Sequence, residues 1–448
     1  MTASLSALTE QLLDAARNAG ADQADALAVR GTSVSIDVLK GKLEHAERSE
    51  GVDIGLRVML GQRQACVSAS DVSASTIETM AERAVAMARE APEDPYIGLA
   101  DVDQLATSWD LDALELADPM ADPDPAELED HARRAEAAAL AVDGVTQVQS
   151  TSTGYGENAI HLATSNGFSG GYARTSRSLS LAAISGEGAT MERDWAGEGR
   201  TFQADLPSPE EIGQEAGERT AARIGAKQPP TGAFPVLFDE RISGSLIGHL
   251  LGASNGSSIV RGASWLREKL GEQVLPAHLS IVEDPHRARI GGSRPFDGEG
   301  LPTARRAIVE NGILTGWTLD LATARQLGLQ STANAARGTS APPSPATSNV
   351  TLTPGDSTRD ELLAQMGTGL LVTSMIGSTI NPTTGDYSRG ASGFWVENGE
   401  ITYPVNECTI AGNLLDMLMR ITPANDAKAH HSRQVPSLLV DGMTLAGA

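Results

Sequence analysis

Histidine and cysteine are the side chains of this 448-residue chain that could hold a catalytic metal. Zinc catalysis needs about three protein ligands, commonly two histidines one helical turn apart, so that one coordination position stays open for water. None of the eight histidines begins a His-Glu-x-x-His motif, and His430 and His431 are adjacent, which is a poor geometry for one rigid site. Cys66 and Cys408 are far apart and form no Cys-x-x-Cys knuckle. The sequence therefore predicts no metal site held by this chain alone.

A serine nucleophile is the second chemistry to consider, because residues 252–256 match the G-x-S-x-G elbow of α/β-hydrolases around Ser254. That motif works only where a strand enters the turn and a helix leaves it. Here the helical pattern 246–251 enters the turn and a serine-rich stretch leaves it. A chance match is the favoured interpretation, and a serine hydrolase that uses Ser254 stays an alternative.

The segment 385–395 combines polar, aromatic and glycine residues and is predicted to be a loop. Glycines allow a close approach of the backbone, and Asp386, Ser388 and Arg389 could bind a carboxylate or a peptide backbone. The alternative is an internal pair of Asp386 with Arg389 that braces a tight turn before a hairpin over 394–403. Both interpretations stay open.

The chain is strongly acidic: 34 Lys and Arg residues face 58 Asp and Glu residues, which leaves a formal net charge of −24. Such a surface repels phosphate backbones and anionic lipid headgroups, so neither nucleic acid nor a membrane is an expected partner. The sequence shows no phosphate-binding loop of the G-x-x-x-x-G-K-[ST] type, no secretory signal and no apolar run of about 18 residues. These observations predict a cytoplasmic protein.

Helix and strand signals alternate through the first half of the chain. Strands are expected at 52–58, where apolar residues alternate, and on both sides of a type I′ turn at Asn166 and Gly167. The acidic, proline-containing stretch 101–124 is expected to be an exposed connector. Helices are predicted at 5–19, at 75–89 and in the stretches that begin at Asp124 and Ser208.

The second half is expected to be richer in strands. Two hairpin turns of nearly the same sequence, at 309–312 and 396–399, are each flanked by β-branched and apolar residues. The stretch 338–348 is rich in Pro, Ser and Thr and is predicted to be a mobile loop. Short helices are predicted at 240–251, 320–327, 360–366 and 413–420.

Clustered strands with helices at their margins favour an α+β fold. The best domain boundary is the stretch 228–232, which contains two prolines and a glycine. It separates an N-terminal domain of mixed helices and antiparallel strands, residues 1–228, from a β-rich C-terminal domain with peripheral helices, residues 229–448.

The chain resembles the TldD/PmbA family, and within it the PmbA (TldE) branch. The likeness covers most of the C-terminal half and extends more weakly to the N-terminal half, through 51–58 and the order of helices and strands. The matching segments are 248–253, 295–300, 366–370, 385–403 with Val405, and 409–414.

This resemblance implies a two-subunit metalloprotease that cleaves small unfolded polypeptides and peptide precursors. In that family the TldD-type subunit carries a His-Glu-x-x-x-His zinc motif, which the PmbA-type partner lacks. Anchored on His249, the motif falls here on Gly244 and Ser245 in place of the first histidine and the glutamate. Glycine offers no metal ligand, and a serine hydroxyl cannot replace a carboxylate that moves protons. His249 is therefore a residual motif position.

The resemblance implies that this chain serves partner docking and substrate binding, with no catalytic residue and no metal of its own. Zinc is expected on a TldD-type partner in a heterodimer. The expected substrate-binding residues are Asp386, Tyr387, Ser388 and Arg389, in a chamber that the two subunits enclose. A non-enzymatic homodimeric binding protein remains an alternative.

Overall fold

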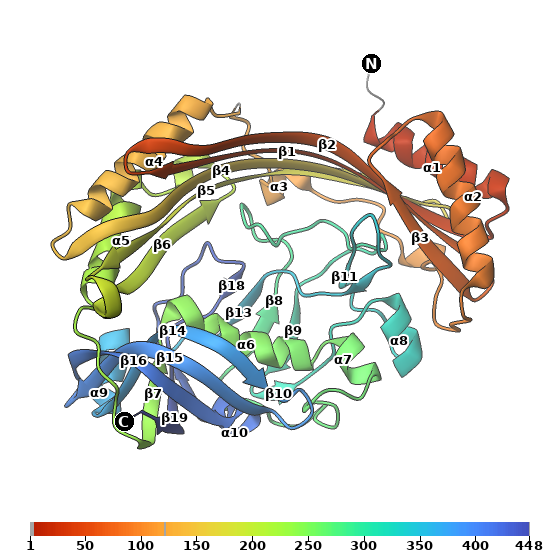
Figure 1. Cartoon of the computed structure of the whole chain (residues 1–448). Coiled ribbons are helices and arrows are strands. Elements are labelled where there is room, and N and C mark those ends of the chain that lie inside the picture. Colours follow the sequence, from red (N-terminus) through yellow and green to blue (C-terminus); the bar gives the residue numbers. More distant parts are fainter. Residues whose placement is uncertain (1–3, 121, 448) are drawn as a thin grey trace.

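A curved six-stranded antiparallel sheet spans the top of the computed structural model, which describes residues 4–120 and 122–447 (Figure 1). Its strands are long: β1 pairs with β2 from Gln23 opposite Met59 to Leu39 opposite Lys42. The order across the sheet is β3-β2-β1-β4-β5-β6. The strands are β1 (Gln23–Leu39), β2 (Lys42–Leu60), β3 (Arg63–Ala69), β4 (Val145–Thr164), β5 (Ser169–Ser185) and β6 (Glu192–Arg200).

Two pairs of helices pack against opposite ends of this sheet (Figure 1). They are α1 (Leu5–Ala19) with α2 (Ala74–Glu90), and α4 (Pro125–Leu140) with α5 (Pro209–Ala221). These four helices confirm the prediction, and their caps explain where they begin and end. Ser4 and Ser73 accept backbone N–H groups of the first turns of α1 and α2, and Gly20 ends α1 with a φ of 95°. In the part of the chain that the structure describes, no helix is both long enough and apolar enough to cross a bilayer.

The stretch 101–124, expected to be an exposed connector, is partly packed between the layers; residue 121 lies outside the described residues. It contains η1 (Val102–Gln104) and α3 (Leu111–Leu114). Leu114 and Leu116 are buried, and the Trp109 ring packs edge-on against that of Phe296 at 4.9 Å. The prediction of an exposed connector was therefore wrong at these apolar residues. The acidic residues between them dominate the composition of the stretch and hid the buried positions.

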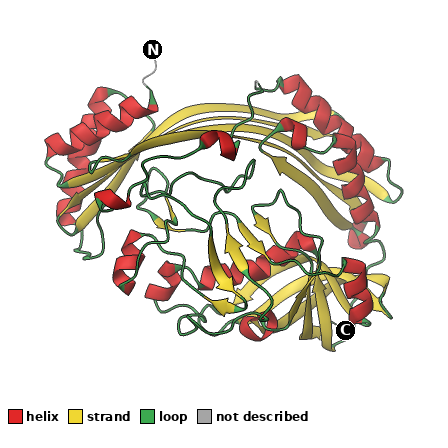
Figure 2. Cartoon of the chain, turned by 180° about the vertical axis from the view of Figure 1, so that it is seen from behind, coloured by secondary structure: helices red, strands yellow, loops and turns green. Residues whose placement is uncertain are grey.

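Below the upper sheet, the second half of the chain is built around a closed ring of strands (Figures 1 and 2). The order is β16-β15-β14-β7-β19-β17, and an additional pairing of β16 with β19 closes the first five of these strands into the ring, while β17 pairs with β19 outside it. Its side chains and the helices beside it form the largest hydrophobic core. The strands are β7 (Gly232–Phe238), β14 (Gly369–Ile380), β15 (Asp386–Glu397), β16 (Glu400–Asn413), β17 (Ile421–Pro423) and β19 (Leu438–Ala446).

Short elements complete this lower body, and the α+β fold predicted from the sequence is confirmed. The predicted short helices are present, with shifts of a few residues at their ends: α6 (Glu240–Ala253), α8 (Leu321–Leu327), α9 (Arg359–Met366) and α10 (Leu414–Leu418). The other elements are α7 (Gly256–Val260), η2 (Gly188–Thr190), η3 (Gln203–Asp205), β8 (Ile281–Glu283), β9 (Arg306–Glu310), β10 (Ile313–Leu314), β11 (Ala335–Ala336), β12 (Ser344–Pro345), β13 (Val350–Leu352) and β18 (Arg433–Gln434).

The predicted hairpin turns agree with the structure in two places and differ in a third. Asn311 and Asn398 have φ values of 49° and 54°, and the glycine after each also has a positive φ, as a type I′ turn requires. At the third hairpin only Gly167 has a positive φ, and the loop is closed by a hydrogen bond from Thr164 N to the Phe168 carbonyl. The hairpin is confirmed, but the predicted turn type is wrong.

One predicted loop is a strand in the structure, and the other is a loop that contains two paired residues. Most of segment 385–395 belongs to β15, in which Tyr387, Ala391 and Trp395 are buried. The glycines and polar residues between them obscured this alternation. In 338–348, residues 344 and 345 pair with β11. Its Thr339 carbonyl oxygen would lie 2.2 Å from a Cβ at Gly55 of β2, so this loop packs against the upper sheet.

A buried charge cluster joins the two layers. Asp25 of β1 forms ion pairs with Arg57 of β2, at 2.5 Å from Nη2, and with Arg337 of the lower body. Burial opposes the ionisation of Asp25, but the two guanidinium groups outweigh it and hold the pKa of Asp25 below its usual value. The named strands before residue 228 and those after it belong to different sheets. The division into domains 1–228 and 229–448 stays a prediction about independent folding.

Candidate functional site

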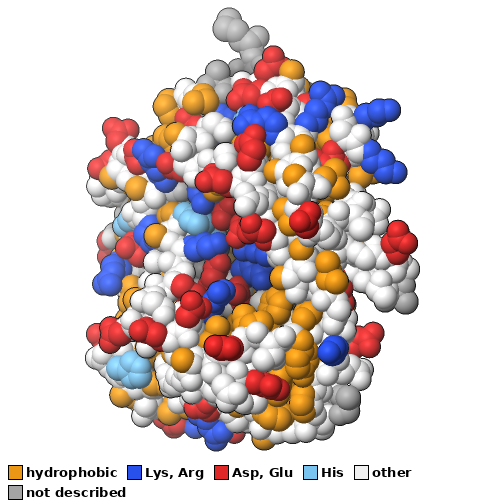
Figure 3. All heavy atoms as spheres, turned by 90° about the vertical axis from the view of Figure 1, so that its left-hand side faces the viewer, with side chains coloured by type: hydrophobic (Ala, Val, Ile, Leu, Met, Phe, Trp, Pro, Cys, Tyr) orange, Lys and Arg blue, Asp and Glu red, His pale blue; other side chains and the backbone are white. Residues whose placement is uncertain are grey.

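Two adjoining cavities separate the upper sheet from the lower body, where β6 and α5 stand over β14 and β15 (Figure 1). The first has a volume of about 750 Å³ and the second of about 690 Å³. Met375 of β14 lines both, so the two cavities adjoin, and together they are called the groove. Figure 3 looks onto this side of the molecule, where charged side chains of both signs lie beside a hydrophobic area.

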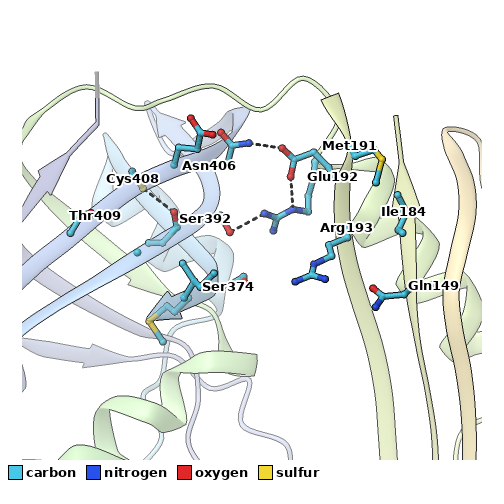
Figure 4. A pocket seen from close by; sticks show the side chains of 16 residues that line it. Gln149, Ile184, Met191, Glu192, Arg193, Ser374, Ser392, Asn406, Cys408 and Thr409 are labelled. Carbon is cyan, nitrogen blue, oxygen red and sulfur yellow. Dashed lines mark hydrogen bonds and ion pairs between the residues drawn. The ribbon is translucent and has the colours of Figure 1, made fainter. Parts of the chain in front are cut away.

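The first cavity lies between β6 and the strands β15 and β16 (Figure 4). Glu192 accepts hydrogen bonds from Asn406 Nδ2 at 2.5 Å and from Arg223 Nε at 3.5 Å, and Arg223 also donates to Ser392 Oγ at 2.8 Å. These bonds tie the two walls of the cavity together. Burial raises the pKa of the Cys408 thiol to about 11, so this cysteine is protonated at neutral pH and is not a nucleophile.

The second cavity is bounded by the first turns of α6 and by the segment that leads into β18. Arg433 lies along α6, and its Nη1 donates to the Gly244 carbonyl at 3.3 Å. A Cβ on Gly248 would stand 2.7 Å from Arg433 Nη1, and a Cβ on Gly244 would stand 3.4 Å from its Cδ. Two glycines one helical turn apart therefore leave the space that the arginine side chain occupies.

His249 is half-buried on the same helix, with its ring 5.9 Å from that of Tyr387. Burial, and then the positive charges of Arg389 and Arg433, lower the pKa of His249. Its buried Nε2 has no hydrogen-bond partner among the described residues. The imidazole is therefore neutral at pH 7 and faces positive groups.

A zinc ion does not fit the α6 positions. Gly244 offers no ligand, and Ser245 Oγ donates to the Ile242 carbonyl at 2.7 Å within the helix. His249 leaves one imidazole, and the guanidinium group of Arg433 opposes a second positive charge beside it. The geometry favours an anion over a metal at this end of the groove.

Glu198 of β6 approaches His430 and His431, and one ligand atom of each lies within 4.8 Å of the others. The glutamate is more than 200 residues away from the two histidines in the sequence. Arg200 Nη1 lies 2.6 Å from Glu198 Oε2, and Lys428 Nζ lies 3.9 Å from Oε1. Burial and then Arg200 lower the pKa of His430 to about 4. Because basic side chains already contact the carboxylate, we interpret this group as an ion-paired network rather than a metal site.

The four predicted substrate-binding residues follow one another on β15, so their side chains alternate between its two faces. Tyr387 is 2% exposed and packs in the core, where burial raises the pKa of its hydroxyl to about 12. Asp386 is exposed and accepts hydrogen bonds from Thr384 and Asn413, which lower its pKa. Ser388 is partly exposed. The structure does not gather the four into one cluster, and their role in binding stays a prediction.

Arg389 is the member of this set that lines the second cavity. Its Nε donates to the Gly377 carbonyl at 2.8 Å. Within residues 4–120 and 122–447 it forms no ion pair with Asp386, so the alternative of an internal bracing pair is wrong.

Ser254, the candidate nucleophile, is fully buried at the end of α6. Its Oγ donates to the Leu251 carbonyl at 3.1 Å, one turn back in the same helix. A helix enters this turn and the short α7 leaves it, so the strand–turn–helix elbow is not formed. The serine hydrolase alternative has no geometric support.

Sequence reasoning missed Arg433 and Glu198. The repeat of glycine at 244 and 248 was a usable signal, because two glycines one turn apart in a helix indicate a close neighbour. No local signal pointed to Glu198, which approaches His430 and His431 only in the folded chain.

The chain matches three sequence profiles of PmbA/TldA metallopeptidases: domain 1 over residues 24–88, the central domain over 118–224 and the C-terminal domain over 231–447. It is 38% identical over 428 residues to the metalloprotease PmbA of Escherichia coli O157:H7, which covers 95% of this chain and 92% of that protein.

Two crystal structures show the same fold. A Bacteroides thetaiotaomicron protein, described as a candidate modulator of DNA gyrase, superposes with a TM-score of 0.91 at 28% identity, over 99% of this chain and 98% of that one. TldE from Thermococcus kodakarensis superposes with a TM-score of 0.85 at 19% identity, over 98% and 100%. The second likeness is one of fold.

Proposed function

The chain belongs to the PmbA/TldD metallopeptidase family, and from this premise we propose that it is the zinc-free subunit of a heteromeric metalloprotease. Its partner is a TldD-type subunit that carries the zinc ion and the glutamate base. Its substrates are small unfolded polypeptides and peptide precursors. This chain supplies partner docking and substrate binding in the cytoplasm, and no bond-breaking step.

The observation that carries this proposal is the position of Arg433 on α6. The guanidinium group lies over Gly244 and Gly248, at the helix positions where the resemblance places the first zinc ligand. A positive side chain there removes the space for a metal and the electrostatic attraction for one. Hydrolysis by zinc then has to take place on another subunit.

The groove supports a role in substrate binding. Its first cavity borders β6, which is an edge strand of the upper sheet. An edge strand presents backbone groups to which an extended peptide can add as a further strand, and main-chain hydrogen bonds tolerate many sequences. A groove with polar and apolar lining suits unfolded chains of varied composition.

Large apolar side chains stand exposed beside the groove and support docking to another chain. Met191 is 47% exposed, Trp195 55% and Ile376 76%. Exposed apolar clusters are typical of interaction surfaces. In this proposal the TldD-type subunit covers them, and a homodimer uses them when the chain is isolated. The net charge of −24 disfavours nucleic acid as the partner.

Co-purification with a TldD-type subunit of the same organism tests the proposal. The complex is expected to cleave an unfolded peptide, and a chelator should abolish this activity. The isolated chain is expected to be inactive and to hold much less than one zinc ion per molecule. Peptide cleavage by the isolated chain would overturn the proposal. A fluorophosphonate label that is lost in Ser254→Ala would favour the serine hydrolase instead.

A further inference from the structure

We propose that the second cavity binds a carboxylate group of the peptide substrate, held by Arg389 and Arg433. The inference rests on the proposed function, because it names the part of the substrate that this chain recognises. A general peptide groove would bind the main chain, whereas here two arginine side chains bind one carboxylate group.

The second cavity carries positive charge that no carboxylate of its lining neutralises. Three arginines line it, in a chain of net charge −24. Arg241 is neutralised by Asp239 at 3.0 Å and by Asp194 at 3.4 Å. Within the described ranges, neither Arg389 nor Arg433 forms an ion pair with a carboxylate. Two guanidinium groups therefore face the cavity without a counter-charge.

The acidic side chain in the lining does not supply the missing charge. Glu240 is paired with Lys428 at 2.9 Å. Glu198, next to the lining residue Gly199, is held by Arg200 at 2.6 Å. His430 and His431 also line the cavity, and burial lowers the pKa of both, so they stay neutral and do not compete for an anion.

Both arginine side chains are held in place and retain free N–H donors. Each donates a hydrogen bond to a backbone carbonyl, Arg389 to Gly377 and Arg433 to Gly244. A guanidinium group has five N–H donors in a fixed plane, so most of them stay available. Burial without a carboxylate partner lowers the pKa of Arg433, and a bound anion would relieve this cost.

A carboxylate is the ligand that suits two arginines best. Arginine pairs with a carboxylate through two parallel hydrogen bonds, and two arginines can hold both oxygens. The second cavity adjoins the first at Met375, which lines both, so an extended peptide that binds in the first cavity can reach the second with a carboxylate. A chain terminus and an acidic side chain both carry that group.

Peptide binding to the isolated full-length chain tests the inference by fluorescence anisotropy. Three N-terminally labelled peptides are compared: one with a free C-terminus and no acidic residue, its C-terminal amide, and the amide with one internal Glu. The free acid is expected to bind at least about tenfold more tightly than the amide. Equally tight binding of the Glu-containing amide would show that a side-chain carboxylate is accepted as well, and tight binding of this peptide alone would identify the side chain as the source.

Arg389→Ala and Arg433→Ala are tested separately, and each should reduce the ratio of the affinities for the carboxylate peptide and the amide toward one. Arg305→Ala, at an exposed position, is the control that should keep the wild-type ratio. Circular dichroism checks folding, and one folded variant suffices. Equal binding of all three peptides by the wild type, or an unchanged preference in the folded arginine variants, would overturn the inference. This binding assay contains neither zinc nor the partner subunit. A two-subunit complex without peptidase activity would therefore refute the proposed function and leave the binding result intact.

Discussion

Arg433 lies across Gly248: a Cβ on this glycine would stand 2.7 Å from the arginine Nη1. The contact is with the end of a flexible side chain and not with backbone, so an added methyl group would displace the arginine rather than break the helix. The position of the Arg433 guanidinium group in the groove thus requires that residue 248 of α6 has no Cβ. Chain positions 185 residues apart are coupled in this way.

Gly248→Ala is predicted to weaken binding of a peptide with a free C-terminus by roughly threefold to tenfold, because Arg433 is displaced. Stability should change little, since alanine favours a helix by about 0.5–1 kcal/mol over glycine and the steric contact offsets that gain. Anisotropy titration and urea unfolding measure the two effects.

Gly252→Ala is the matched control on the same helix, because a Cβ there meets nothing within 4 Å. This variant should gain about 0.5–1 kcal/mol of stability and bind the peptide as the wild type does. Equal peptide affinities for the two alanine variants would contradict the coupling between Gly248 and Arg433.

Rebuilding the zinc motif of the partner should fail while Arg433 is present. The double variant Gly244→His/Ser245→Glu supplies a second imidazole and a carboxylate next to His249. The guanidinium group still lies over the helix, and its charge opposes the metal. Adding Arg433→Ala is predicted to increase the zinc affinity on the order of tenfold. Competition with a chromogenic chelator measures the affinity.

The control for this experiment removes the other histidines of the groove. All variants also carry His430→Ala and His431→Ala, so that zinc cannot bind beside Glu198. Arg433→Ala alone, with Gly244 and Ser245 unchanged, should bind no zinc. Identical zinc affinities with and without Arg433 would show that the arginine does not decide the loss of the metal site.

Local signals explain why much of the fold could be predicted from the sequence. Gly20 and Ser208 mark helix ends through the hydrogen bonds of their own neighbours, and the Asn398–Gly399 turn follows from the φ angles that two residues can adopt. The α+β class then follows from the order of the elements. The closure of the strand ring could not be predicted, because it depends on the pairing of β16 with β19.

The candidate site depended on contacts between distant segments, and so it was predicted in part. Arg389 was identified because it lies in a segment of unusual composition, yet that segment is a strand and its Tyr387 faces the core. Arg433 had no local signal at all. Its role follows from Gly244 and Gly248, which are remote in the sequence and adjacent in space. Side chains that act through tertiary contacts leave no periodic pattern.

Arg389→Ala in the two-subunit complex is predicted to reduce kcat/KM for an unfolded peptide about tenfold, mainly by raising KM, because it removes one of two groups that hold the substrate. Arg305→Ala, exposed and outside the groove, is the control with unchanged kinetics. Steady-state cleavage assays provide both constants. Unchanged turnover by the Arg389 variant would remove this residue from the substrate site.

Glu299 is predicted to make the stability of the fold depend on pH. Burial, followed by the neighbouring Asp297 and Asp320, raises its pKa from 4.5 to about 8. Between these values the folded chain keeps a proton that the unfolded chain has lost, so stability falls as the pH rises through this window and levels off above it. Between pH 6 and pH 9 the free energy of unfolding of the wild type should therefore fall by about 2–3 kcal/mol more than that of Glu299→Gln. Urea unfolding measures both. Glu310→Gln, at an exposed position, should follow the wild type, and a wild-type slope in the Glu299 variant would contradict the assignment.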